Sequence, residues 1–474
     1  VLYIGALAGY SNYSNIQNIK LIGDNNVIEN TGNTTYLYEG GLIGYAYKGS
    51  INACDIIVNI KGNPTTNNKY IGGIIGYNDA NNSLSKSSAK GKIINNSNQV
   101  VEENIGGLIG YSRREINTSY SNIDIESNSQ GNIGGLIGNF EGYSQVIEKT
   151  YSMGNIKIET ENGSSNVGGL IGKTTTVRGY LSLNDSYSTT NITANLGETM
   201  STVGGIIGNS EETTISNTYV AGKVNAIGNN AKVGGIIGEN KGDSTVTNSY
   251  WNQESLENFT NTIGYSKMMQ EMLYKDCYKG WDFTNIWIID ENGGSLPYLR
   301  NFDKPSNITK DNYDYVEYEG SGTEQDPFII KTIQQLKKIS YFNDKKYFVI
   351  ANDIDASELG VIDTIGNKTR KFNGILDGKN YSLKNLHIES DYNYVGIFPQ
   401  NAGTIKNLKI ENLDVKSNYN GAISYVGGLV GYNSGIIEKV EVNGTVQNVG
   451  NVTELYMGQI VGYNQSNIKL VNSN

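Results

Sequence analysis

The chain offers little for catalysis or metal binding that depends on histidine. The only histidine is His387, in the stretch Leu386-His-Ile-Glu-Ser390. A zinc peptidase motif needs two histidines on one helix face, and a Ser-His-Asp triad needs a GxSxG turn, which the chain lacks. Hydrophobic residues flank His387 on both sides, a pattern typical of a β-strand. We therefore interpret it as a strand histidine and expect neither a catalytic residue nor a metal ligand.

Carboxylates offer the alternative chemistry. The densest group is Asp353, Asp355 and Asp363, followed by Asp377 and Lys379. Glycoside hydrolases use paired carboxylates, and polysaccharide lyases use carboxylates that bind calcium beside a Lys or Arg base. However, Asp353 and Asp377 stand beside Asn or Gly, where an Asp side chain commonly stabilises a turn. We favour turn residues and keep a carbohydrate-active enzyme as the alternative.

The overall composition restricts the partners. The 474 residues include 47 acidic and 37 basic side chains, a net charge of −10, which argues against nucleic acid and anionic membrane surfaces. Cys54 and Cys277 are too few and too distant for a disulfide framework or a zinc site. No apolar run reaches the roughly 18 residues of a membrane span, and Val1–Gly9 lacks the basic leader of a signal peptide. We expect no cofactor.

The elements that position these residues are written as a repeat. A block of the type Ile105-Gly-Gly-Leu-Ile-Gly-Tyr111 recurs, and its last glycine falls 28 to 36 residues after the previous one. These glycines are Gly9, Gly44, Gly76, Gly110, Gly138, Gly172, Gly208 and Gly238, and the block returns at Gly431 and Gly462. A period of 20–50 residues predicts a solenoid or propeller. A propeller blade needs about 40–45 residues and usually a repeated Trp, so we favour the solenoid.

Each block is followed by two further strand-like segments, which suits one coil of a three-faced parallel β-solenoid. Stacked coils place equivalent residues in ladders about 4.8 Å apart. We expect an inward aliphatic ladder of Ile116, Ile147, Leu183, Ile215 and Val246. Three positions later we expect a ladder of small residues, Ser119, Thr150, Ser186, Thr218 and Ser249, which Cys54 joins as a buried thiol.

The rhythm changes twice along the chain. We expect a first solenoid over 1–251, a cap over 252–303, a linker over 304–318 and a second solenoid over 319–474. Residues 265–274 are expected to form a short helix in the cap, with Trp281, Phe283 and Trp287 as an aromatic plug on the open solenoid end. A second cap helix is expected near 332–341.

The blocks and the following I-x-N-S/T-Y segments resemble the GLUG repeat. The segments Gly280–Trp287 and Gly320–Phe328 resemble the sequences that flank GLUG arrays. Such arrays occur in large surface or secreted bacterial proteins, including the non-catalytic N-terminal part of Gram-positive immunoglobulin A peptidases. The resemblance implies a right-handed parallel β-helix that is extracellular, either secreted or attached to the cell wall.

Binding is the function that the repeat favours. Tyr45, Tyr77 and Tyr111 end successive blocks and are expected to form a row that binds sugars or proteins, or else to pack at a corner. In a flat strand, Leu108 and Leu136 would join an exposed aliphatic stripe, which requires either a glycine bend that turns them inward or a covering partner. We expect a non-catalytic adhesin, stalk or substrate-positioning module whose partner is a host protein, a glycan surface or another domain of the same chain.

Overall fold

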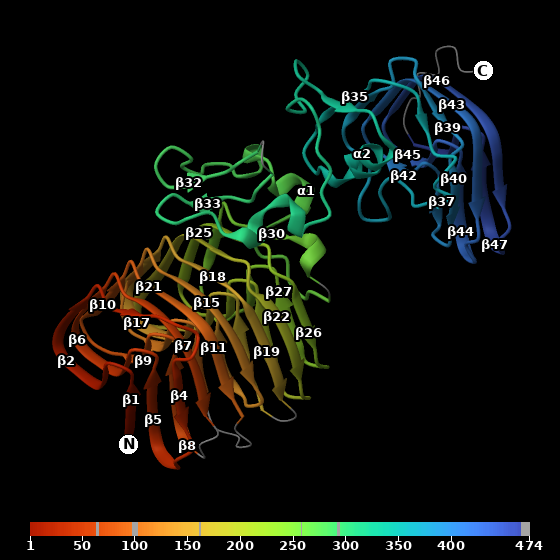
Figure 1. Ribbon diagram of the computed structural model, residues 1–474. Coiled ribbons are helices and arrows are strands. Elements are labelled where there is room, and N and C mark those ends of the chain that lie inside the picture. The colour runs from red at the N-terminus through yellow and green to blue at the C-terminus, as the bar shows by residue number, and fades with distance from the viewer. Residues whose placement is uncertain (63–65, 97–102, 161–162, 257, 292–293, 466–474) are drawn as a thin grey trace. The chain divides into compact units, whose positions relative to one another are not determined.

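The computed structural model describes residues 1–62, 66–96, 103–160, 163–256, 258–291 and 294–465 (Figure 1). The chain divides into two compact units, Val1–Asn312 and Tyr313–Asn474, here called unit 1 and unit 2. Both are parallel β-solenoids, with about 14 turns in total. Within the described ranges, no helix is long and apolar enough to cross a membrane.

In unit 1 each coil contributes one strand to an eight-stranded parallel sheet, here called the short sheet. Its strands in order are β1 (Leu2–Gly5), β5 (Thr34–Gly40), β8 (Thr66–Gly72), β12 (Glu103–Gly106), β16 (Gly131–Gly134), β20 (Asn166–Gly168), β23 (Ser201–Gly204) and β27 (Ala231–Gly234). The strand order follows the chain order, so each coil lies directly on the one before it.

The other segments of each coil form a sheet of 23 strands, here called the long sheet. The strands that follow the glycine block are β2 (Ala8–Gln17), β6 (Ile43–Asn52), β9 (Ile75–Asn78), β10 (Asn82–Ser85), β13 (Ile109–Ser112), β14 (Ile116–Asn117), β17 (Ile137–Glu148), β21 (Ile171–Ser188), β24 (Ile207–Ser210), β25 (Thr213–Val220), β28 (Ile237–Asn240) and β29 (Thr245–Thr247). The third segment gives β3 (Lys20–Leu21), β4 (Val27–Asn30), β7 (Asp55–Gly62), β11 (Ser88–Asn95), β15 (Tyr120–Ser127), β18 (Tyr151–Met153), β19 (Asn155–Thr160), β22 (Asn191–Leu196), β26 (Val224–Ile227), β30 (Tyr250–Asn252) and β31 (Tyr265–Lys267).

The two ladders of the repeat run along this long sheet. Ile116 pairs with Ile147, Ile147 with Leu183, Leu183 with Ile215, and Ile215 with Val246. In the second ladder the serine hydroxyls accept from the coil before them: the Thr150 N–H donates to Ser186 Oγ at 3.2 Å, and Ser186 Oγ donates to the Asn184 carbonyl at 2.8 Å. Cys54 occupies the same position and is buried, with its N–H donating to Ser87 Oγ. This ladder satisfies backbone groups at a corner that would otherwise be left unpaired.

The glycine block forms the corner between the short sheet and the long sheet. Leu108 lies between β12 and β13 and is completely buried, as is Leu136 one coil later. The N–H groups of Leu108 and Ile109 both donate to the Leu136 carbonyl, at 2.9 and 3.0 Å. The chain therefore bends at this point and turns the leucine into the core, as the bend alternative proposed.

The glycines are needed here for a reason other than their φ angles. Gly106, Gly107 and Gly110 are absent from the residues with positive φ. A Cβ on Gly107 would lie 2.1 Å from the Gly135 carbonyl oxygen, and one on Gly106 would lie 2.0 Å from the Ile109 oxygen. Close approach of neighbouring backbones, rather than an unusual dihedral angle, therefore excludes other residues at these positions.

The segment after the first solenoid lies along its side as well as closing its end. At the end, Trp251 enters the core, and Leu256 and Asn261 form bridges to Val224 and Gly234. Along the side, Tyr120, Tyr151, Tyr187 and Tyr219 stack at 4.6 to 4.9 Å between ring centroids. Phe302, Trp287 and Trp281 pack on this tyrosine row, and the Tyr219 hydroxyl donates to the Pro297 carbonyl at 2.8 Å. Trp281, Trp287 and Phe283, which stacks on Trp281, therefore belong to a lateral segment rather than to an end plug. The described residues from Lys275 to Asn312 are here called the lateral brace.

Helix is scarce in this segment. The expected helix over 265–274 is reduced to α1 (Met269–Met272), because Tyr265–Lys267 instead pairs with β30 as strand β31. The 3-10 turn η1 (Gln253–Ser255) directly follows β30. The lateral brace contains the 3-10 turns η2 (Lys275–Cys277), η3 (Ser306–Ile308) and η4 (Lys310–Asn312). It also contains the antiparallel strand pair β32 (Trp287–Ile288) and β33 (Tyr298–Leu299). Tyr265 stacks obliquely on Tyr250, so continuation of the tyrosine row favours a strand.

Unit 2 is built the same way around a column of phenylalanines. Its largest sheet holds β34 (Phe328–Ile330), β35 (Tyr347–Ile350), β36 (Ile354–Asp355), β37 (Val361–Ile362), β38 (Ile375–Asp377), β39 (Ser382–Lys384), β40 (His387–Ser390), β43 (Thr404–Ser417) and β46 (Ile436–Asn448). Two three-stranded sheets hold β41 (Tyr394–Val395), β44 (Gly421–Gly427) and β47 (Val452–Gly458), and β42 (Phe398–Asn401), β45 (Val430–Asn433) and β48 (Val461–Asn464). Phe328, Phe348, Phe372 and Phe398 stack inside, and none is more than 1% exposed.

The cap helix of unit 2 is α2 (Ile333–Lys338), continued by the 3-10 turn η5 (Ile339–Tyr341). Thr332 caps it, because its hydroxyl accepts from the Gln335 N–H at 3.2 Å while the Gln335 side chain accepts from the Thr332 N–H. Its apolar face is buried, with Leu336 completely enclosed. The opposite face carries Gln334 and Lys337 toward a cavity described below.

Candidate binding surfaces

The predicted tyrosine row exists and is doubled. Tyr10, Tyr45, Tyr77 and Tyr111 stack in the long sheet at centroid distances of 5.3, 5.0 and 4.4 Å. Tyr3, Tyr38 and Tyr70 stack in the short sheet at 5.2 Å and meet the first row edge to face. Both faces of Tyr45 and Tyr77 are therefore covered by neighbouring rings, and Tyr111 is only 5% exposed.

Charged side chains surround the rim of this double row. The Tyr45 hydroxyl donates to Asp79 at 2.5 Å, and the Tyr111 hydroxyl donates to Glu141 at 2.7 Å. Arg113 bridges the two carboxylates, with distances of 3.3 Å to Asp79 and 3.6 Å to Glu141. Burial, followed by the hydrogen bonds to these carboxylates, raises the pKa of Tyr45 and Tyr111. Both phenols therefore remain hydrogen-bond donors, and the arrangement holds neighbouring coils together.

Leu108 and Leu136 do not contribute to a binding surface. Both side chains have 0% exposure and lie in the core of unit 1, so the expectation that they present an apolar stripe to a partner is corrected. For Tyr45 and Tyr77, only ring edges and hydroxyls are left for a ligand, because stacking occupies the ring faces. Sugars bind aromatic residues through the ring face, which this row does not offer.

Three of the carboxylates considered for catalysis are hydrogen-bonded to the next coil. Asp353 accepts from Lys384 at 2.8 Å and Asp355 accepts from Asn385 at 2.7 Å, and these hydrogen bonds lower the pKa of both carboxyls. Asp377 accepts from Asn407 at 2.9 Å, again on the next coil. These three residues therefore stabilise turns and their ladders. Among the residues that the structure describes, no group of three His, Cys, Asp or Glu is placed to hold a metal ion.

His387 lies on strand β40, as its flanking pattern indicated. Its Nε2 is 3.3 Å from Glu389 Oε1 and 3.6 Å from Asp414 Oδ2, and Lys416 also contacts Glu389 at 3.1 Å. Within the described part of the chain, no serine or threonine forms a hydrogen bond with this imidazole. The residue thus belongs to a partly exposed polar ladder on the sheet surface.

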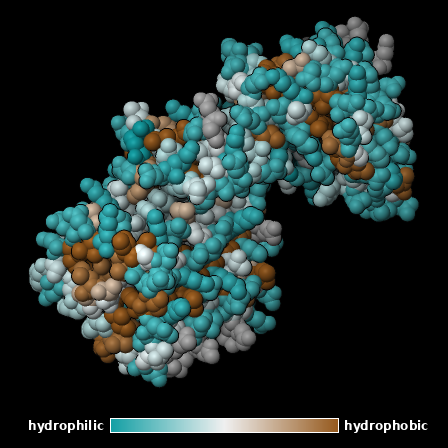
Figure 2. All heavy atoms as spheres, in the orientation of Figure 1, coloured by the Kyte–Doolittle hydropathy of each residue, from teal (hydrophilic) through white to brown (hydrophobic). Residues whose placement is uncertain are grey.

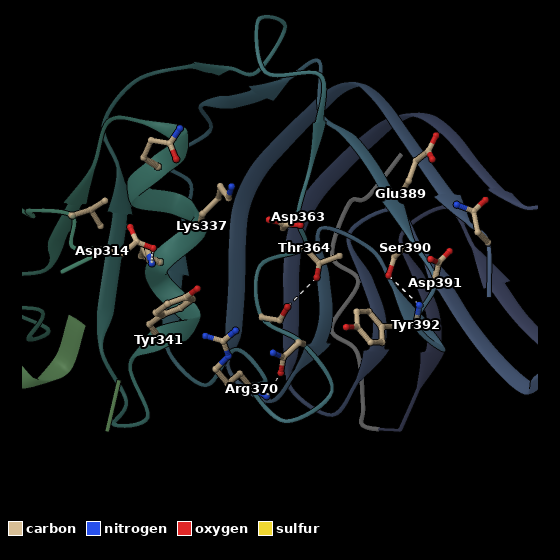
Figure 3. Close-up of a pocket in the computed structure, with 16 residues that line it drawn as sticks. Asp314, Lys337, Tyr341, Asp363, Thr364, Arg370, Glu389, Ser390, Asp391 and Tyr392 are labelled. Atoms are coloured by element: carbon tan, nitrogen blue, oxygen red, sulfur yellow. Dashed lines mark hydrogen bonds and ion pairs between the residues drawn. The ribbon is translucent and has the colours of Figure 1, made fainter. Parts of the chain in front are cut away.

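Asp363, unlike the other three carboxylates, lines a cavity of unit 2 of about 910 Å³ (Figure 3). One wall is the polar face of α2 and η5, with Lys337 and Tyr341; the other is the end of β40 and the turn that follows it. The loop 363–370 lies between the two walls. Figure 3 shows the Tyr392 ring between this loop and the strand wall. This cavity is here called the α2 groove.

The side chains of the α2 groove combine donors, acceptors and an aromatic ring. Lys338 pairs with Asp314 at 2.5 Å, and the Lys338 Nζ and Arg370 Cζ lie 4.1 and 4.3 Å from the Tyr341 ring centroid. These contacts fix the wall and the loop in place. Tyr392 is 64% exposed, so its ring remains accessible in the groove.

Sequence reasoning identified only one lining residue of this groove. Arg370, Tyr392 and Lys337 lie in or beside segments without periodicity, and a search for repeats passes over them. A usable signal was present: residues 356–371 and 389–393 interrupt the strand rhythm with polar and aromatic residues. Insertions of this kind in a solenoid form loops on one face, which is often the binding face.

Fold and groove together define a parallel β-solenoid repeat protein with a polar cavity. Residues 422–447, which include the Val426–Tyr432 block, match the family model of the GLUG motif. Among curated proteins, the chain is 31% identical over 136 residues to a Gly-rich membrane protein of Evansella cellulosilytica, covering 26% of this chain and 15% of that protein. It is 31% identical over 144 residues to halomucin of Haloquadratum walsbyi, covering 27% of this chain and 2% of that protein.

The chain thus spans a small part of the length of these relatives. Among solved structures, a comparison with the PL6 family alginate lyase AlyGC gives a TM-score of 0.13 at 9% identity, with 92% of this chain and 83% of the lyase covered. A likeness at that level carries no argument about fold or activity.

Proposed function

We propose that this chain is a non-catalytic extracellular scaffold, an adhesin, stalk or substrate-positioning module, that binds a glycan in the α2 groove of unit 2. The repeat architecture, the GLUG motif and the names of the two relatives, a Gly-rich membrane protein and halomucin, support the extracellular assignment. The groove is the observation that carries the binding role.

The chemistry of the groove suits a hydroxyl-rich ligand. Lys337 and Arg370 supply donors, Asp363 and Asp391 supply acceptors, and the exposed Tyr392 ring supplies a face for a sugar ring. Four carboxylates and three cationic side chains line the cavity, so the charges nearly cancel and do not select a strongly anionic ligand. Its volume lies in the usual range for small-ligand sites.

Binding to a panel of immobilised glycans and soluble oligosaccharides tests this proposal. We expect at least one neutral oligosaccharide to bind the full chain, and Tyr392→Ala or Arg370→Ala to weaken that binding at least tenfold. Tyr143→Ala is the matched control, because Tyr143 is also exposed, at 54%, but lies in unit 1. Equal loss in the control, or retention of binding in both groove variants, would contradict the site.

The carbohydrate-active enzyme is kept as a second candidate because Asp363, Asp391 and Arg370 line one cavity. Incubating the chain with the same polysaccharides and measuring new reducing ends or unsaturated products separates the two functions. The scaffold proposal expects binding without product. Product formation that Asp363→Asn abolishes would establish the enzyme instead.

Localisation has its own test. If the chain is part of a secreted or wall-attached protein, protease treatment of intact cells should release its peptides, whereas a cytosolic marker stays intact. Protection equal to that of the marker would contradict the extracellular assignment. A host protein or another domain of the same polypeptide remains the alternative partner if no glycan binds.

A further inference from the structure

A charged cluster lies inside unit 1, whose core is mostly aliphatic. Lys69 on β8 and Glu103 on β12 both have side chains with 0% exposure, and Asn95 at the end of β11 is likewise completely buried. Lys69 and Glu103 are paired across the short sheet, whereas Asn95 comes from the long sheet. The cluster therefore connects the two sheets of unit 1 through completely buried side chains.

The three side chains contact one another directly. The Lys69 Nζ donates to Glu103 Oε1 at 2.8 Å and to Asn95 Oδ1 at 3.1 Å. The Asn95 Nδ2 donates to Glu103 Oε2 in a short hydrogen bond, and to Ser129 Oγ at 2.8 Å. Ser129 also donates to Glu103. An amine, a carboxamide and a carboxyl group are thus held in contact, with the amine beside the carboxamide carbonyl and the carboxyl beside its nitrogen.

Burial changes the chemistry of this triad. A buried ion pair has a large desolvation penalty, which transfer of one proton from the ammonium to the carboxylate removes. The transfer leaves a neutral amine, which is a nucleophile, and a neutral carboxylic acid, which is a proton donor. With both groups fixed in contact with the carboxamide, the reaction becomes intramolecular, and effective molarities for such reactions are high.

We propose that Lys69 and Asn95 form an intramolecular isopeptide bond, with Glu103 as the catalytic acid and base. The Lys69 ammonium gives a proton to Glu103, and the neutral Nζ attacks Cγ of Asn95. Glu103 then protonates Nδ2 and accepts one proton from Nζ. The Cγ–Nδ2 bond breaks, ammonia leaves, and an Nζ–Cγ amide remains, with Glu103 protonated. No oxidant, metal or cofactor takes part.

The bond would close almost one complete coil into a covalent ring. The chain leaves Lys69 on β8, passes through β9 and β10, and reaches Asn95 at the end of β11, a separation of 26 residues. A crosslink of this kind restricts the unfolded chain as a disulfide does, but it cannot be reduced. It would also prevent this coil from opening when force is applied along the chain.

Mass spectrometry of the denatured full-length chain tests the bond. We expect the intact mass to lie about 17 Da below the sequence mass, the loss of one ammonia. A succinimide at Asn95 gives the same loss, so the decisive result is a tryptic product in which 62–86 is joined to 93–113 through Lys69 and Asn95. An intact mass equal to the sequence mass, or Lys69 recovered as a free amine, would overturn the proposal.

Two carboxylate variants separate the role of Glu103 from general effects of burial. Glu103→Gln keeps the shape but cannot transfer the proton, so we expect the full sequence mass adjusted only for the substitution. Glu39→Gln is the matched control, because Glu39 is also completely buried on the short sheet but has no hydrogen-bond partner among the described residues. We expect it to retain the linked peptide. A linked peptide in Glu103→Gln would overturn the role of Glu103.

Discussion

At the scale of single residues, the glycine block is explained by distances between backbones. Successive coils approach so closely at the corner that Gly107 faces the Gly135 carbonyl on one side and Ser121 Oγ on the other. The block recurs because every coil makes the same corner. The leucine at its centre fills the interior of the turn, and the neighbouring glycines allow the coils to stack.

Gly107→Ala should therefore destabilise unit 1 although alanine is a better strand residue than glycine. The new Cβ would lie 2.1 Å from a carbonyl oxygen of the next coil, which has no room to move. We expect a loss of about 1–3 kcal/mol, the range for overpacked cores, measured as a lower denaturant midpoint. Gly32→Ala is the control, since its nearest atom is 3.4 Å away. Equal midpoints for the two variants would contradict close approach as the cause.

Glu39 gives unit 1 a specific pH dependence. It occupies a position paired with Ile4 and Ile71, and burial raises the pKa of its carboxyl from 4.5 to about 8. The Lys69 ammonium, which is present only while the isopeptide bond is unformed, partly opposes this rise. The folded state holds this proton more tightly than the unfolded state. The protonated carboxyl therefore contributes fully to the stability of the folded state below pH 4.5, and this contribution is lost as the pH rises to about 8.

Glu39→Gln tests this dependence because the amide cannot ionise. Between pH 5 and 8 the stability of the variant should rise relative to the natural chain by up to about 1.4 kcal/mol per pH unit, and then level off. Unfolding midpoints of both proteins across this pH range measure the difference. If the unfolding midpoints of the two proteins changed with pH in parallel, the Glu39 carboxyl would already be ionised in the folded protein.

At the scale of elements, the lateral brace is the part of unit 1 that does not repeat. It covers one row of tyrosines with aromatic side chains and ties to the coils by hydrogen bonds such as that from Trp287 Nε1 to Asp185 at 3.3 Å. Trp287 is completely buried, whereas Phe283 is half-buried. The brace should thus depend on a few aromatic contacts rather than on backbone pairing.

Trp287→Ala should release the brace from the coils. Truncation of a buried Trp typically costs about 3–5 kcal/mol, and here most of that loss falls on the contact between brace and tyrosine row. We expect faster amide hydrogen exchange over residues 275–300, with the coil cores unchanged. Phe283→Ala is the matched variant and should cause a smaller change. Uniform acceleration across all coils would show instead that the brace stabilises unit 1 as a whole.

Elements that repeat could be predicted from the sequence, whereas of the elements that occur once the sequence predicted the cap helix α2 but not the course of the lateral brace. The ladders through Ile116 and Ser119 follow from periodicity, because the same position recurs in every coil. The helix expected over 265–274 is mostly absent because Tyr265 lies on a strand that extends a row of tyrosines. The sequence alone does not show that this strand competes with helix formation. The sequence did not predict the contact among Lys69, Asn95 and Glu103, because this contact depends on the register between coils and between sheets.

At the scale of the whole molecule, the chain forms two separate hydrophobic cores. Unit 1 has an aliphatic core and unit 2 a phenylalanine column, and each unit is compact by itself. Chains longer than about 250–300 residues usually divide in this way, because one core stops growing. Figure 2 shows that hydrophobic residues also reach the surface at the first coil, where Leu7, Ile22 and Val27 are exposed.

The two interiors should unfold separately. Scanning calorimetry of the full chain should show two transitions, and a core substitution should lower only the one belonging to its own unit. Gly107→Ala reports on unit 1, and Leu376→Ala, at a residue with 0% exposure, reports on unit 2 with an expected loss of about 2–5 kcal/mol. If each substitution lowered both transitions equally, the units would be thermodynamically coupled. Independent transitions would mean that the α2 groove keeps its shape when unit 1 is destabilised, so that glycan binding should survive Gly107→Ala.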